Sequence, residues 1–484
     1  MYSARVADTS TSLPASTLGR RAHALDALRG FAILTMALSG MLHAYDLPAW
    51  MYHAQRPPPN YAFDPALPGL TWVDLVFPFF LFSMGAAMPL ALTSRIARGA
   101  RGWQLAAYAV RRGLLLLAFA VYVDHIVPWK FEVAGQVSTG RWLWSLLAFA
   151  LLFPALARLP GHWPTWRVWA ARLVGWGGAS ALLATVHYPN GTGFSLEHTD
   201  IIIVVLAHTA TAGMLLWLIS RDNLPLRLGF MLVVLTIILG AGPPGWLHEV
   251  WHVRSPQRSL LLAGYLKYLL IVLPGTIAGD GLLEWQRGSM HGSRPGWSRP
   301  RYLALLALTP ALCVLVCAGL QARWLPGTTF ASFALLAAGA GLVAGPRTDL
   351  ETLLRRLYGW GALWLVLGLL VEPFEGGIRK DHATISYYFV TSGLAVLALM
   401  IFLVLIDRFG RGRWLWLLIA SGQNPMVAYV GIRNLVPPVL GLLMIERTVS
   451  RWPLTAWLGF GWACLKTGLV AAAASVCTRF KIVW

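Results

Sequence analysis

Charged residues are scarce in this chain, and acidic residues are the scarcest. Only 12% of the 484 residues are charged, with 20 Asp and Glu against 39 Lys and Arg, whereas soluble proteins have about 25% charged residues. This deficit excludes a soluble multidomain enzyme and a disordered protein. With 57% hydrophobic residues and a mean hydropathy of +0.61, the composition predicts a polytopic membrane protein.

Cysteine and the common motifs of soluble enzymes are also rare or missing. The four cysteines all lie inside apolar runs, which excludes a disulfide scaffold and indicates no metal site. The chain has no nucleotide-binding loop with a Walker lysine, no dinucleotide-binding glycine pattern after a strand and no metalloprotease histidine helix. These absences argue against an ATP-driven pump and a redox enzyme, and we expect no metal cofactor.

Long apolar runs are what the chain has in abundance, and most match the roughly 20 residues that a transmembrane helix needs. We therefore expect an all-α polytopic bundle of 10 to 14 transmembrane helices in the bacterial inner membrane. Residues 1–24 are expected to form a polar tail without a signal peptide, and residues 25–484 a single membrane domain. The runs are centred near Leu34, Phe80, Phe119, Leu151, Ser180, Leu206, Val234, Ile271, Leu308, Ala337, Val366, Leu397, Val430 and Ala471.

The basic residues cluster in short loops, and this pattern predicts the orientation of the helices. The segment 95–112 holds five arginines and no acidic residue, whereas the segment 187–200 has no Lys or Arg. Because Lys and Arg are retained on the cytoplasmic side, we expect both termini in the cytoplasm and residues 43–69, 187–200, 242–258 and 372–383 to face outward. The net charge of +19 then reflects topology, and a nucleic-acid partner is not expected.

Three ionisable residues lie in or beside the first two apolar runs, where burial in hydrocarbon is costly. Asp26 and Arg29 are three residues apart on one helical face, so they form either an anchoring ion pair or contacts for a ligand. Asp74 lies just inside the outer end of the second helix, with no cation within one turn. This position favours a pocket residue over a structural hydrogen bond.

The outward loop between these two helices combines histidines with aromatic and amide side chains. His43 and His53 lie with Trp50 and Gln55 ahead of three consecutive prolines, which hold the chain extended. This composition suits a polar, ring-shaped ligand such as a sugar. An aromatic belt at the membrane interface would have a similar composition.

A second group of polar residues follows late in the chain. Lys380 stands in a charged stretch before the run at residue 385, and Arg433 lies within an apolar helix, where it needs a partner or an anionic ligand. A helix break is predicted at Asn424, because the proline after it frees backbone groups that protein or water must satisfy. A further break is predicted at residues 273–280 (LPGTIAGD).

These segments resemble the heparan-α-glucosaminide N-acetyltransferase family, most closely its bacterial NagX-type branch. The likeness is strongest over residues 25–30 (LDALRG), 50–53 (WMYH) and 68–85 (PGLTWVDLVFPFFLFSMG), and weaker over residues 380–388, 421–429 and 480–482. The resemblance implies an enzyme that moves an acetyl group from cytosolic acetyl-CoA to an amino sugar, such as glucosamine, on the periplasmic side. Polymeric heparan is not expected as the substrate, because the large luminal N-terminal domain of the animal enzymes is missing.

By this resemblance, His53 matches the functional histidine of the family, with His43 as its competitor, and Ser39 stands where the family has a functional asparagine. The histidine would act as a general base or carry the acetyl group covalently, and both schemes remain open. Asp74 would be the second catalytic residue and would orient the imidazole or hold the ammonium group of the sugar. The residues expected to bind the substrate are Trp50, Gln55, Lys380 and Asn424, and those expected to bind CoA are Asp26, Arg29 and Arg433.

Two other functions are compatible with the sequence. A sugar permease of the inner membrane would line its path with the same polar residues, and an O-acyltransferase would modify a hydroxyl of an envelope glycan. Sugar uptake without acetyl-CoA would identify the permease, and a base-labile product would identify the ester. The sequence also leaves open whether the chain forms a homodimer.

Overall fold

The computed structural model describes residues 22–42, 46–133, 136–252, 260, 262–288, 296–449, 451–452 and 455–483. Within these ranges the chain is helical and has no β-strand, only two isolated bridges, Val133–Gln136 and His187–Gly193. The first helix begins at His23, two residues before the predicted start of the membrane domain, and most of the predicted tail lies outside the described residues.

The helices follow one another through short connections. The first half of the chain forms α1 (His23–Gly40), η2 (Ala49–Met51), α2 (Trp72–Ile96), α3 (Gly102–His125), η3 (Pro128–Phe131), α4 (Thr139–Leu156), α5 (Thr165–Ala184), α6 (Ile201–Ser220), α7 (Leu224–Gly240) and α8 (Trp246–Trp251). The second half forms η4 (Ala263–Tyr268), α9 (Leu269–Arg287), α10 (Arg299–Gln321), α11 (Leu325–Leu342), α12 (Asp349–Val371), η5 (Glu372–Glu375) and α13 (Ile385–Leu403). The chain ends with η6 (Val404–Arg408), η7 (Arg411–Arg413), α14 (Trp416–Gln423), α15 (Pro425–Asn434), α16 (Val436–Leu442), α17 (Ile445–Val449) and α18 (Ala456–Arg479).

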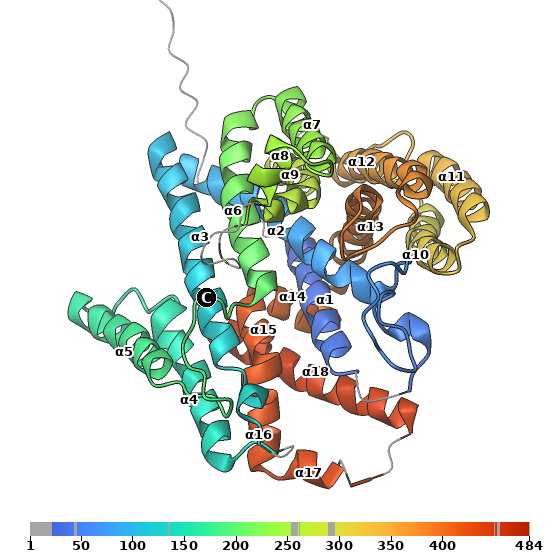
Figure 1. Ribbon diagram of the computed structural model, residues 1–484. Helices are drawn as coiled ribbons and strands as arrows, with labels where there is room; N and C mark the ends of the chain where they lie inside the picture. Colours follow the sequence, from blue (N-terminus) through green and yellow to red (C-terminus); the bar gives the residue numbers. More distant parts are fainter. Residues whose placement is uncertain are drawn as a thin grey trace, which may run out of the picture.

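Among the described helices, ten are long and apolar enough to cross a membrane, which confirms the predicted all-α polytopic bundle. They are α2, α3, α4, α6, α9, α10, α11, α12, α13 and α18, with η4 extending α9. Every predicted apolar run coincides with a helix, including α1, α5, α7 and the broken segment α14–α16. The most buried spans are α2, α9 and α13, whereas α4 and α5 lie at one edge and α10 and α11 at the opposite edge (Figure 1).

Successive long helices run in opposite directions, so their ends gather on two faces of the bundle. The histidine face, named here for His53, carries residues 46–71, 185–200 and 372–384, and hydrogen bonds such as Gly69 N to Ile378 O (2.8 Å) join its loops. The arginine face carries residues 97–101, 296–298 and 409–415. Asp26 near the start of α1 accepts a hydrogen bond from Gln423 at 3.2 Å, which brings α1 and α14 together on the arginine face.

The helix break predicted before Pro425 is confirmed. Helix α14 ends at Gln423 and α15 begins at Pro425, with Asn424 between them. The Asn424 side-chain amide donates to Thr478 Oγ1 at 2.7 Å and to the Ile482 carbonyl at 2.9 Å. Since these partners lie at the end of α18, the described ends of the chain share the arginine face. Which side of the membrane this face meets stays a prediction.

The break predicted around Pro274 is wrong, because α9 continues through it. Proline leaves the Leu270 carbonyl without its helical partner, and the Ser392 hydroxyl of α13 donates to that carbonyl at 3.4 Å. The neighbouring glycines serve packing: a Cβ on Gly275 or Gly279 would come within 2.3 Å of a backbone oxygen of α2. The backbones of α2 and α9 are therefore nearly in contact, as small residues allow in membranes.

Candidate functional site

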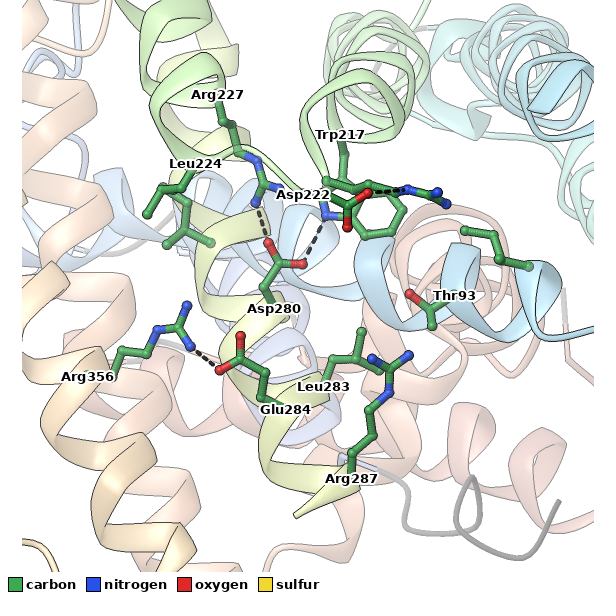
Figure 2. A pocket seen from close by; sticks show the side chains of 13 residues that line it. Thr93, Trp217, Asp222, Leu224, Arg227, Asp280, Leu283, Glu284, Arg287 and Arg356 are labelled. Carbon is green, nitrogen blue, oxygen red and sulfur yellow. Dashed lines mark hydrogen bonds and ion pairs between the residues drawn. The ribbon is translucent and has the colours of Figure 1, made fainter. Parts of the chain in front are cut away.

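The described part of the chain has a polar cavity on each face of the bundle. The cavity on the arginine face, of about 430 Å³, lies between the ends of α2, α6, α7, α9 and α12 (Figure 2). Its deepest charge is the Arg227 guanidinium, 1% exposed, which pairs with Asp280. The Trp217 indole donates to the same carboxylate at 3.0 Å.

The other acidic residues of this cavity also pair with arginines. Glu284 pairs with Arg356, and Asp222 pairs with Arg221 at 3.0 Å. The pairs Arg227–Asp280 and Arg356–Glu284 join α9 to α7 and α12, and the opposite charges that line the cavity largely cancel. The cavity contains none of the residues that the sequence singled out for catalysis or binding.

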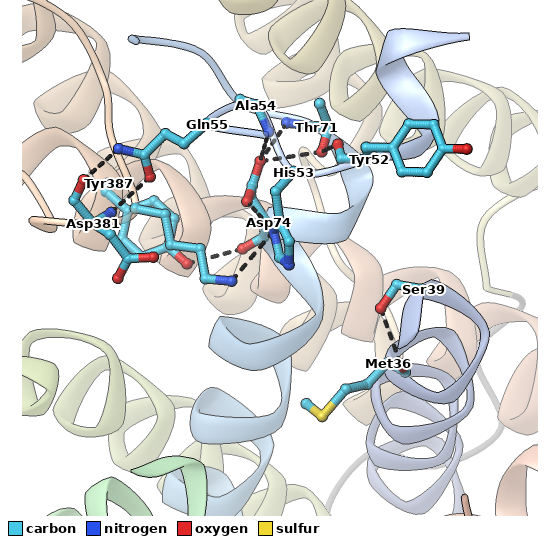
Figure 3. Close-up of polar contacts among 11 residues, drawn as sticks. Met36, Ser39, Tyr52, His53, Ala54, Gln55, Thr71, Asp74, Asp381 and Tyr387 are labelled. Atoms are coloured by element: carbon cyan, nitrogen blue, oxygen red, sulfur yellow. Dashed lines mark hydrogen bonds and ion pairs between the residues drawn. The ribbon is translucent and has the colours of Figure 1, made fainter. Parts of the chain in front are cut away.

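The cavity on the histidine face gathers predicted site residues from two distant segments. It measures about 310 Å³ and is lined by His53, Gln55, Arg56, Phe63, Lys380 and Asp381. The first four come from the loop between α1 and α2, and the last two from the loop before α13. Figure 3 shows His53 and Gln55 of the first loop beside Asp381 of the second.

The centre of this cavity is a histidine–carboxylate pair. His53 Nδ1 lies 2.6 Å from Asp74 Oδ1, in the first turn of α2. The Asp74 side chain is 2% exposed, whereas the His53 side chain is 31% exposed and reaches the cavity. With Nδ1–H donating to the carboxylate, Nε2 is the ring nitrogen that can accept a proton.

Backbone donors hold Asp74 in this position. Its Oδ2 accepts hydrogen bonds from Ala54 N and Thr71 N, and the Thr71 hydroxyl oxygen also lies nearby, each at 3.1 Å. The carboxylate also stands in the first turn of α2, where the helix dipole favours a negative charge. The buried charge is therefore satisfied by hydrogen bonds and by the imidazole, as a stable buried carboxylate requires.

The His53 main chain is fixed on both sides by local packing. Tyr52 is buried in a small hydrophobic cluster with Leu42, Leu47 and Met51, and its carbonyl accepts a hydrogen bond from Thr71 Oγ1 at 2.7 Å. Ala54 on the other side is bound to Asp74. The imidazole therefore projects from an anchored segment, although the loop has only one short helix, η2.

A proline in α2 ties the pair to α13. Pro78 has no N–H for the Asp74 carbonyl four residues earlier, and the Tyr387 hydroxyl donates to that carbonyl at 2.9 Å. Tyr387 is fully buried near the start of α13. The sequence identified both segments but gave no sign that they meet. Pro78 does indicate that the Asp74 carbonyl needs a hydrogen-bond donor from outside α2.

Gln55 joins the two loops of the cavity. Its Oε1 accepts from Asp381 N at 2.9 Å, and its Nε2 donates to the Asp381 carbonyl and to the Pro65 carbonyl, the latter at 3.1 Å. Gln55 is 3% exposed, so these bonds replace the hydrogen bonds that its amide would otherwise make to water. Gln55 thus lines the predicted site, but its amide is engaged with the protein backbone.

Replacing Gln55 with alanine is expected to loosen the loop that carries Lys380. The change removes three part-buried hydrogen bonds to the backbone of Asp381 and Pro65, each of which contributes about 0.5–1.5 kcal/mol. Limited trypsin digestion should therefore cut faster after Lys380 in this variant. Asn60→Ala, at an exposed position of the loop that carries Gln55, is the matched control. Equal cleavage of both variants would contradict this role for Gln55.

Lys380 approaches the histidine from the second loop. Its Nζ lies 3.3 Å from His53 Nδ1, although 327 residues separate them in the sequence. The structure therefore brings Lys380, which the sequence predicted to bind the substrate, beside the pair of His53 and Asp74. Phe63 of the cavity lining was not predicted as a site residue, because an aromatic residue in a loop of a membrane protein gives no distinctive sequence pattern.

Other predicted site residues lie elsewhere. Trp50 in η2 is 54% exposed and is not part of the cavity lining. Ser39, near the C-terminal end of α1, donates its hydroxyl to the Met36 carbonyl of its own helix at 2.9 Å, apart from the histidine pair (Figure 3). His43 lies outside the described residues, so its competition with His53 stays as the sequence left it.

Asp26 and Arg29 form a second group, on the arginine face. Arg29 lies 3.8 Å from Asp26 and donates to the carbonyls of Gly422 and Ser83 at 3.3 and 3.2 Å. Asn424 belongs to the same side, since it binds the end of α18. The structure therefore does not bring Asn424 to His53, where an oxyanion contact would be needed.

Arg433 lies on the histidine face and not with Arg29. Its guanidinium donates to Asp200 at 3.0 Å, and the Tyr429 hydroxyl donates to the same oxygen at 2.7 Å. Asp200 is the N-cap of α6, at the end of the loop 185–200 on the histidine face. The three residues predicted to bind CoA are thus divided between the two faces, and Arg433 has the acidic partner that its position requires.

The described residues contain no cluster of three or more His, Cys, Asp or Glu side chains that could hold a metal ion. A search of curated proteins found no match to the chain. The model of one family, described as a domain of unknown function (DUF5009), matches residues 21–282, which is more than half of the 484 residues. The matched part includes His53 and Asp74 but not Lys380. The chain therefore belongs to the DUF5009 family.

Proposed function

We propose that this protein is a transmembrane acetyltransferase that uses cytosolic acetyl-CoA to acetylate an amino sugar on the periplasmic side of the bacterial inner membrane. The observation that carries the proposal is the pair formed by His53 and the buried Asp74, 2.6 Å apart at the wall of a polar cavity. An imidazole oriented by a carboxylate is the usual form of a general base.

The chemistry assigns a role to each member of the pair. The neutral amine of the acceptor attacks the carbonyl carbon of the acetyl thioester, a C–N bond forms and the C–S bond breaks. His53 Nε2 accepts the proton lost by the amine, and the CoA thiolate leaves. Asp74 keeps the ring in the required tautomer and stabilises the imidazolium.

The resemblance noted in the sequence supports acyl transfer as the reaction. Its strongest segments include the residues of the histidine pair, and one of its weaker segments begins at Lys380, which contacts His53. The donor would approach from the arginine face, because retained arginines mark the cytoplasmic side. Arg29 on that face is part-buried and remains the proposed contact for CoA, whereas Arg433 is not retained in this role.

Sealed liposomes test the proposal directly. Purified protein is reconstituted, labelled acetyl-CoA is added outside and glucosamine is enclosed inside, and the reverse arrangement is prepared in parallel. Acetylated sugar is expected only when the donor meets the arginine face. Product formation in both arrangements to the same extent, with protein inserted in one orientation, would contradict vectorial transfer.

The same assay addresses the competing function. The two cavities open on opposite faces of the bundle, which is the observation that favours a sugar permease. A permease would move unmodified sugar across the membrane without acetyl-CoA. A product that is hydrolysed by mild base would instead identify an ester and hence an O-acyltransferase.

A further inference from the structure

The cavity on the histidine face has an excess of positive charge. Lys380 and Arg56 line it, and Asp381 is the one acidic residue in its lining. Asp381 also faces Lys267 of η4, with which it interacts electrostatically. The buried Asp74 carboxylate also interacts electrostatically with Lys380. Three cations therefore stand against two carboxylates, and opposite charges balance only in part.

Asp74 offers no free oxygen to a ligand. Its two oxygens already receive the His53 ring and the backbone N–H groups of Ala54 and Thr71, and its side chain is 2% exposed. An ammonium group of a sugar would therefore find no free carboxylate there. The sequence had left this role for Asp74 open, and the geometry disfavours it.

The position of Lys380 sets where a negative charge would bind. Its ammonium group lies 3.3 Å from the His53 ring, beside the proposed reacting centre. The Arg56 side chain is on the first loop and reaches the same cavity, where its guanidinium stands 5.7 Å from the centre of the Phe63 ring. A lysine and an arginine on facing loops suit an anionic group, for which charge-assisted hydrogen bonds are the strongest contacts.

We propose that the acceptor substrate carries an acidic group, a phosphate or a carboxylate on the sugar, which Lys380 and Arg56 bind. This inference rests on the proposed function, because it specifies the acceptor of the same site. The nearby cations also disfavour a protonated amine, so the acceptor amine is neutral when it attacks. The anionic group supplies the affinity that a cationic amino sugar would lack here.

Binding measurements without acetyl-CoA test this inference separately from catalysis. The protein in lipid nanodiscs is titrated calorimetrically with glucosamine, glucosamine 6-phosphate and glucuronate. We expect at least one anionic sugar to bind about tenfold or more tightly than glucosamine, as one additional charge-assisted hydrogen bond allows. The two anionic probes distinguish a phosphate site from a carboxylate site.

Variants identify the cations responsible. Lys380→Gln and Arg56→Gln are each expected to lower the affinity for the preferred anionic probe about tenfold and to change the affinity for glucosamine less than about twofold. Arg451→Gln removes an exposed cation that does not line the cavity and should leave all three affinities unchanged.

The outcomes separate the two proposals. Equal binding of neutral and anionic sugars, or binding of no sugar, would overturn the acidic acceptor. Anionic binding that Lys380→Gln and Arg56→Gln do not weaken would overturn it as well. Binding as expected without any acetyl transfer would leave the anion-binding site at Lys380 and Arg56 standing and remove the acetyltransferase.

Discussion

Replacing His53 with alanine is expected to lower the rate of acetyl transfer by about 10²- to 10⁴-fold, the usual contribution of a general base. The ring is the partly exposed member of the buried pair, so its removal takes away the proton acceptor, while the backbone N–H groups of Ala54 and Thr71 still hold the Asp74 carboxylate. The measurement is acetylated sugar formed per protein under single-turnover conditions. CoA binding is expected to stay unchanged, because the proposed CoA contact, Arg29, lies on the arginine face.

His187→Ala is the matched control. His187 is an exposed histidine of the histidine face, and its ring lies 3.0 Å from the Thr185 carbonyl, outside the cavity. The control should retain full transfer and the same melting temperature. Normal turnover of His53→Ala would remove this residue from the mechanism and direct attention to His43.

Replacing Gly30 with alanine is expected to destabilise the protein by about 3 kcal/mol or more, at the upper end of what overpacking costs. A Cβ on Gly30 would lie 1.8 Å from the Leu418 carbonyl oxygen of α14. The reciprocal position is equally tight, since a Cβ on Gly422 would lie 1.8 Å from the Asp26 carbonyl oxygen. Because both obstacles are backbone atoms, α1 and α14 would have to separate.

Thermal unfolding in detergent measures this effect. Gly468→Ala in α18 is the matched control, because a Cβ there meets no atom within 4 Å. Alanine in a helix is favoured over glycine by about 0.5–1 kcal/mol, so this control should keep or raise the melting temperature. Equal melting temperatures of both variants would show that α1 and α14 do not cross at these glycines.

The position of the helices was largely predictable, whereas the interruptions within them were not. Each apolar run became a helix because the run length matches the membrane thickness. The sequences around Pro274 and Pro425 both predicted a break, and only the second one occurs. The difference arises from a neighbour: Ser392 of α13 satisfies the carbonyl that Pro274 frees.

The candidate site, like the helix breaks, could be predicted only in part. A histidine in an outward loop and an aspartate at the start of α2 could be grouped, because the loop ends where the helix begins. Asn424 and Arg433 could not be assigned, since both are polar residues in one apolar stretch. Their partners, Thr478 and Asp200, are distant in the sequence.

Hydrophobicity and charge act locally along the chain, so the sequence by itself determined a polytopic helical bundle, the extent of its helices and the arginine-rich loops. The tertiary structure decided which polar residues meet. The pairing of Lys380 with His53, the Gln55 bridge to Asp381 and the Tyr387 hydrogen bond to Asp74 each join segments more than 300 residues apart. Such contacts depend on how the helices pack, and helix packing depends on close fits such as that of Gly30 against α14.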